Sequence, residues 1–102
     1  MKIQISVSAN DFVYNLNVDT QTNFFVCNGK NKNLNAFEFK EKLFDIIFCW
    51  DKNMVIPNIT DAQEYKIYIS DYNEHLTLVG KGKYPENYND FISLLKEVEN
   101  NE

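Results

Sequence analysis

A stretch rich in glycine and lysine, GKGKYPEN at residues 80–87, has the residue types that could bind a phosphate. It would join a strand to a helix, and the backbone N–H groups at a helix N-terminus favour anions. The two glycines would let the backbone approach a phosphate, and the two lysines would add positive charge. The candidate ligand-binding residues are therefore Gly80, Lys81, Gly82, Lys83 and Tyr84.

The same stretch would also make a good corner between a strand and a helix, and we favour this interpretation. It lacks the Walker pattern G-x-x-x-x-G-K-[ST], and Pro85 stands where the dinucleotide fingerprint needs its third glycine. Proline removes a backbone donor, and Glu86 adds a negative charge at the helix start. As a corner, the glycines give backbone freedom, Tyr84 covers the edge of the core, and Pro85 begins the helix.

No other group of side chains has the spacing of a catalytic or metal site. His75 is the only histidine, and no serine or cysteine nucleophile accompanies it in a recognisable context. The carboxylates are scattered and lack the ligand spacing of a calcium loop. Cys27 and Cys49 fit no C-x-x-C pattern, so we expect both to be free thiols buried in the core. We expect no enzyme activity, no metal and no cofactor.

The composition argues against several classes of partner. The formal net charge is −5, and the 10 basic residues are all lysines, whereas direct binding of nucleic acid needs clustered Lys and Arg. The N-terminal residues alternate in polarity, unlike a signal peptide, and no run approaches the ~18 apolar residues of a membrane span. We expect one cytoplasmic domain, residues 1–102, that binds neither nucleic acid directly nor a membrane.

The order of apolar residues predicts three strands, a helix, two strands and a second helix. Residues 2–8 and 12–18 alternate in polarity, and residues 23–27 (NFFVC) are typical of a third strand. Short polar turns join the three strands, so they form an antiparallel meander. Residues 65–69 and 75–79 form a second hairpin. The simplest arrangement is an α+β fold, an antiparallel sheet of about five strands with both helices packed on one face.

Each predicted helix has a start signal and one main apolar stripe. Asn35 and Glu38 have the spacing of a capping box, and Pro57 limits the first helix to an end near residues 51–53. Residues 54–64 read as an irregular crossing. The stripes that would face the sheet are Phe39, Leu43, Ile46, Ile47 and Trp50 in the first helix, and Tyr88, Phe91, Ile92, Leu95 and Val98 in the second.

The first helix has a second apolar stripe that packing on one sheet face does not require. Phe37, Phe44 and Phe48 are spaced at i, i+7 and i+11, so they lie close together on the helix surface. Either the second helix or the segment after the first helix buries them, or they form an exposed aromatic surface that contacts a partner. Full burial of Phe37 and Phe44 by the chain itself would exclude the second alternative.

The second half of the chain carries a set of linked motifs. Trp50 ends the first helix, Asp61 and EYKIYI follow, and Gly80 to Phe91 fit G-x-x-x-Y-P-E-N-[YF]-x-x-F. These motifs, over roughly residues 36–98, resemble an uncharacterised family of small proteins from low-GC bacteria. The resemblance implies a hairpin-to-helix corner, a bacterial origin and a cytosolic location. It implies no catalytic or binding residue.

Small size, acidity and the lack of site chemistry favour a non-catalytic protein-binding domain. We expect an inhibitor or neutraliser of another protein, of the immunity or anti-defence type. The candidate partner-binding residues belong to the phenylalanine stripe and to the acidic face of the second helix: Phe37, Phe44, Phe48, Glu86, Asp90 and Glu97. An exposed sheet edge could also bind by strand addition. The alternatives are a small-molecule binding protein for a phosphorylated ligand at Gly80–Tyr84, and a homodimer that pairs edge strands.

Overall fold

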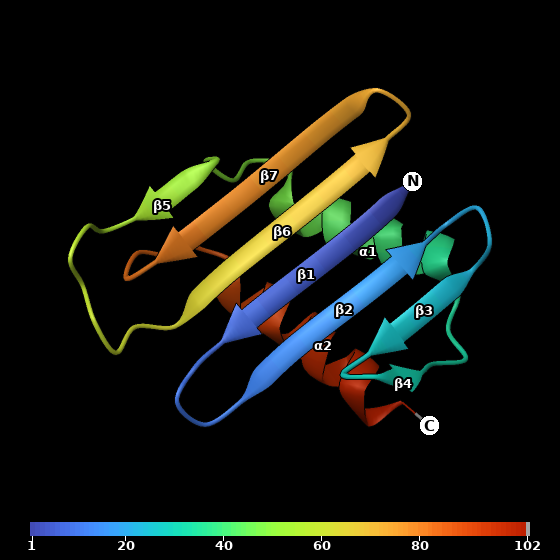
Figure 1. The fold of residues 1–102 in the computed structure, drawn as a ribbon, viewed down its shortest axis with the longest axis horizontal. Helices are drawn as coiled ribbons and strands as arrows, with labels where there is room; N and C mark the ends of the chain where they lie inside the picture. The colour runs from blue at the N-terminus through green and yellow to red at the C-terminus, as the bar shows by residue number, and fades with distance from the viewer. Residues whose placement is uncertain (102) are drawn as a thin grey trace.

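Residues 1–101 form one sheet with two helices on one of its faces, as the computed structural model describes them (Figure 1). The sheet has seven strands in the order β4-β3-β2-β1-β6-β7-β5. β5 is parallel to β7, and the other neighbours are antiparallel. The elements in chain order are β1 (Lys2–Ser8), β2 (Val13–Asp19), β3 (Phe24–Cys27), β4 (Lys30–Asn31), α1 (Ala36–Ile47), β5 (Asn53–Val55), β6 (Glu64–Asp71), β7 (Glu74–Lys81) and α2 (Tyr88–Asn100).

The α+β class and the placement of both helices on one face are confirmed, but the sheet differs from the predicted one. β4 and β5 add two strands, and the parallel pairing of β5 makes the sheet mixed, so the prediction of five antiparallel strands was wrong. Met54 and Val55 of β5 lie in the stretch that we expected to be an irregular crossing, and Asn53 lies where we expected the first helix to end. Strands of two or three residues are too short to show an alternating pattern, which explains why both were missed.

The helix starts and ends also differ in part from those predicted. The Asn35 side chain accepts a hydrogen bond from the Glu38 N–H at 3.0 Å, which confirms the predicted N-cap. α1 ends at Ile47, earlier than expected. Pro85 lies in a turn before α2 rather than in its first turn, because the Tyr88 N–H bonds to the Pro85 carbonyl at 3.1 Å.

The core lies between the sheet and the helix layer. β1, β2 and β6 alternate regularly between buried and exposed residues, and the buried ones face the helices. Cys27 is buried as expected, but Cys49 is exposed, because the helix ends before it and the chain turns outward there. Ile46, Trp50 and Ile92 of the predicted stripes are only partly buried. The residues that fill the centre are Ile3, Val7, Leu16, Leu43, Tyr65, Ile67, Phe91 and Leu95.

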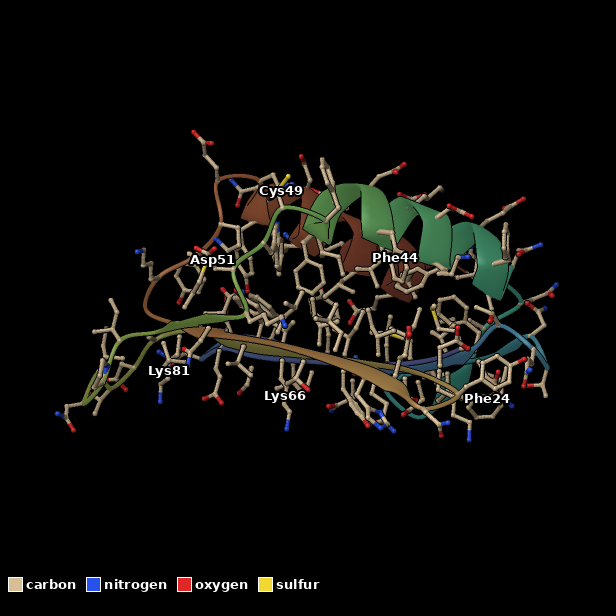
Figure 2. All side chains as sticks on the ribbon, turned by 90° about the horizontal axis from the view of Figure 1, so that it is seen from above. Phe24, Phe44, Cys49, Asp51, Lys66 and Lys81 are labelled. Carbon is tan, nitrogen blue, oxygen red and sulfur yellow. The ribbon has the colours of Figure 1, made fainter. Side chains whose placement is uncertain are left out.

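Within residues 1–101, no helix covers the opposite face of the sheet (Figure 1). Its central residues are polar, as the alternation of β1 and β2 requires. Figure 2 shows Lys66 pointing away from the helix layer on this face. Tyr68 also lies here, and its hydroxyl is 3.0 Å from Nδ1 of His75 on the neighbouring strand. The histidine is therefore on the face opposite to the helices, and so is far from the exposed thiol of Cys49.

The corner after β7 is filled by an aromatic side chain. A Cβ atom added to Gly80 would lie 2.1 Å from Cε2 of Tyr65, so no larger residue fits without movement of the buried ring. Gly82 has a φ of +83°, a backbone conformation that favours glycine. Gly82 gives the turn the backbone freedom that the corner interpretation predicts, whereas Gly80 lies within β7 and allows the close approach of Tyr65 instead.

Replacing Gly80 with alanine is expected to destabilise the fold. The new methyl group would collide with the ring of the fully buried Tyr65, and overpacking of this kind costs about 1–3 kcal/mol. Urea unfolding followed by circular dichroism measures the change. Thr77→Ala in the same strand is the control, since Thr77 is exposed and its truncation should change stability little. Equal stability of the two variants would contradict the proposed contact.

Candidate functional site

The candidate site is a hollow at the C-terminal end of α1, where the chain passes from the helix layer to the sheet. Its lining comes from two stretches that are far apart in the sequence: residues 46–54, which run from the end of α1 into β5, and residues 84–87, in the turn before α2. Figure 2 shows Asp51 at this crossing between the layers. The lining residues that matter for its chemistry are Phe48, Trp50, Asp51, Tyr84 and Glu86. We call this surface the α1-end hollow.

One asparagine holds the α1-end hollow together. The indole N–H of Trp50 donates to Oδ1 of Asn87 at 2.6 Å, and Nδ2 of Asn87 donates to the Ile46 carbonyl at 2.7 Å. The second bond satisfies a carbonyl in the last turn of α1, which has no partner within the helix. Asn87 thus joins the end of α1 to the start of α2 and fixes the ring of Trp50.

An aromatic cluster forms the floor beneath the hollow. Trp50 packs edge-on against Tyr65 and Phe91, with ring centroids 5.4 and 5.3 Å apart, and Tyr84 stacks on Tyr88 at 4.8 Å. Burial raises the pKa of Tyr65 to about 12, and the Asp51 carboxylate acts in the same direction. The hydroxyl of Tyr65 therefore stays protonated at neutral pH. The floor consists of packed aromatic rings, whereas the charged side chains lie at the rim.

The rim of the hollow is negative. Asp51 and Glu86 are both exposed, and neither forms an ion pair within residues 1–101. The last turn of α1 contains no basic residue, so its partial negative charge adds to theirs. A positively charged group is the ligand that this rim favours.

The phenylalanine stripe is largely exposed. Phe48 is 79% exposed and Phe37 is 54% exposed, while Phe44 is partly buried at the edge of the core. The chain therefore does not bury the stripe, and the alternative of an exposed aromatic surface stays open. Nζ of Lys40 lies 4.1 Å from the centre of the Phe37 ring and partly covers that end of the stripe.

The six predicted partner-binding residues do not form one surface. Lys42 on one flank of α1 pairs with Glu97 of α2 at 3.7 Å, and the phenylalanine stripe lies on the other flank, where Figure 2 shows Phe44. Asp90 and Glu97 are exposed on α2. Only Phe48 and Glu86 line the same hollow.

Sequence reasoning missed Trp50, Asp51 and Asn87 of the site. Trp50 was assigned to the apolar stripe of the first helix, and Asp51 was counted among scattered carboxylates. The signal that could have found them is the motif that links Trp50 with Y-P-E-N, because Trp50 and Asn87 are hydrogen-bonded. The spacing along the chain could not show that contact.

The predicted ligand-binding residues do not surround a common space. The ring of Tyr65 fills the space beside the Cα atom of Gly80, and Nζ of Lys81 pairs with the Glu64 carboxylate at 3.8 Å. The N–H of Gly82 donates to the Tyr84 hydroxyl at 3.3 Å, and that hydroxyl donates to the Gln63 carbonyl at 2.6 Å. These contacts use donors that a phosphate would need, so the geometry gives no support to this alternative.

Within residues 1–101, no three His, Cys, Asp or Glu side chains gather closely enough to hold a metal ion. No helix in that range has both the length and the apolar composition needed to cross a membrane.

Replacing Asn87 with alanine is expected to loosen the α1-end hollow. The variant loses the bonds to the Trp50 indole and the Ile46 carbonyl, and the unpaired groups should cost about 1–3 kcal/mol. Trp50 is the only tryptophan, so its fluorescence reports directly on the site. The expected result is a changed emission spectrum with a lower urea midpoint. Asn89→Ala, an exposed position in α2, is the control; an unchanged spectrum and midpoint for Asn87→Ala would contradict the role of Asn87.

The comparisons with known proteins do not assign the chain to a family. No protein-family model matches it, no curated protein matches its sequence, and no solved structure matches its fold. The resemblance drawn from Trp50 and the Y-P-E-N turn therefore stays a prediction, and function is inferred from the geometry of the site.

Proposed function

We propose that this chain is a non-catalytic, cytoplasmic bacterial domain that binds another protein and inhibits or neutralises it, as immunity and anti-defence proteins do. One observation carries the proposal: the highly exposed Phe48 lies beside the two unpaired carboxylates of Asp51 and Glu86. An exposed aromatic ring beside charges of one sign suits a protein surface that offers an apolar pocket and a basic side chain.

The two parts of this surface contribute differently to binding. Burying an exposed phenylalanine side chain stabilises a complex by roughly 1.5–3 kcal/mol, which makes Phe48 the expected anchor. The carboxylates lie at the rim, where charges mainly increase the rate of association and select the partner. The net charge of −5 acts in the same direction over longer distances.

Capture with a tagged protein from the native cells tests the proposal. We expect one basic protein to be enriched and identified by mass spectrometry, and we expect its recovery to fall as salt is raised. Failure to enrich any protein with well-folded bait would contradict the proposed function.

Substitutions in the α1-end hollow should weaken that complex. Phe48→Ala is expected to raise the Kd by about tenfold or more through faster dissociation. Glu86→Lys is expected to raise it by about fivefold, mainly through slower association at low salt. Surface plasmon resonance with the captured protein separates the two rates.

Two controls match these substitutions. Asp11→Lys makes the same charge change as Glu86→Lys, in the exposed turn between β1 and β2, outside the hollow. Tyr72→Ala removes an exposed aromatic ring from the turn between β6 and β7, where the ring is 88% exposed. If either control weakened binding as much as the substitution that it matches, the bound protein would not be using the α1-end hollow.

A further inference from the structure

One edge of the sheet is covered over only half of its length. β5 pairs with Val79–Lys81 of β7, and the segment around it adds a bond from the Val79 N–H to the Lys52 carbonyl at 3.0 Å. Within residues 1–101, Glu74–Leu78 of β7 pair with β6 on one side and with no strand on the other. Figure 1 shows β5 beside the arrowhead half of β7 only. We call Glu74–Leu78 the free edge.

The free edge presents backbone groups that a strand would satisfy. In an antiparallel ladder successive residues direct their N–H and C=O groups alternately to the two sides. The Val79 N–H points outward to Lys52, so the same alternation directs the backbone groups of Thr77 and His75 outward. Both residues are exposed. The free edge therefore offers two donors and two acceptors at strand spacing.

An apolar groove runs along the same edge on its helix side. It lies between α1 and β7 and is lined by Phe44, Ile47, Phe48, Trp50, Leu76 and Leu78, with Lys52 at the point where β5 begins. Leu76 and Leu78 alternate with the residues whose backbone groups point outward. An extended chain bonded to the free edge would therefore direct every second side chain into the groove.

We infer that the partner binds this protein by strand addition to the free edge of β7. The inference rests on the proposed function and specifies its binding mode. The bound segment is extended, places one or two apolar side chains in the groove, and carries Lys or Arg beside them. The basic residues follow from the net charge of −5 and from the exposed carboxylate of Glu74, which begins the free edge. They are expected at the Glu74 end, because the positive side chain of Lys52 lines the groove at its other end. Phe48 lines both the groove and the α1-end hollow, so the two surfaces are continuous.

Charge favours a basic partner over a second copy of this chain. Self-pairing of the free edge would be antiparallel about Leu76 and would bring two chains of net charge −5 together. It would also place two Glu74 carboxylates in one short ladder, with no lysine or arginine in the free edge to oppose them.

The test removes one outward donor. Thr77→Pro eliminates an N–H that β6 does not use, and proline is tolerated on an edge strand whose N–H faces solvent. Thr77→Ala keeps the N–H and is the matched control. With the captured partner, we expect Thr77→Pro to raise the Kd by at least about tenfold and Thr77→Ala to leave it unchanged. Circular dichroism checks that both variants fold.

Amide hydrogen exchange of the wild-type chain gives a second readout that needs no variant. In the complex, the Thr77 and His75 amides should exchange at least about tenfold more slowly, as the amides of a paired strand do. Unchanged exchange at both amides, or unchanged affinity of a folded Thr77→Pro variant, would overturn strand addition. If Glu86→Lys and Phe48→Ala still weakened that complex, the proposed function would stand and only the strand-addition binding mode would be wrong. Size-exclusion chromatography with light scattering measures whether the chain forms a dimer. A wild-type dimer that becomes a monomer in the Thr77→Pro variant would show that a second copy of the chain occupies the free edge, and would overturn the inferred basic partner.

Discussion

The hydrogen bonds of Asn87 are the contact on which the arrangement of the site depends. α1 and α2 are separated by three strands in the sequence, and each packs on the sheet through its own apolar stripe. Packing of this kind fixes how deeply a helix lies but leaves some freedom along its axis. By bonding to both the Trp50 indole and the Ile46 carbonyl, Asn87 sets where α1 ends relative to α2. The positions of Phe48, Asp51 and Glu86 follow from that.

The half-covered edge of the sheet has a simple origin in the chain path. The chain leaves the helix layer after Trp50 and reaches the sheet only at Lys52, beside Val79, so β5 cannot cover the residues that precede Val79. After Val55 it cannot extend far either, because Pro57 has no N–H to donate. β5 is therefore limited to three residues. The groove beside β7 lies open where this short strand does not reach.

Elements with many residues and one buried face were predictable from the sequence. The alternation of β1, β2 and β6 and the N-cap of α1 each leave a local pattern of residue types. β5 leaves none, since three residues carry no period and their pairing with β7 depends on the folded chain. The exposed phenylalanine stripe that includes Phe48 was predictable, because the helix has more apolar residues than packing on one sheet face needs. The contact between Trp50 and Asn87 leaves no local pattern of residue types, because it joins residues 37 positions apart.

The two cysteines differ in a way that makes the chain easy to label. Cys27 is buried, and burial raises the pKa of its thiol, so it reacts slowly with alkylating reagents. Cys49 is exposed and lines the α1-end hollow. Maleimide chemistry on the unaltered chain should therefore attach a fluorophore or spin label at one position, beside Phe48 and Asp51. The native sequence thus provides a selective attachment point at the surface where binding is proposed.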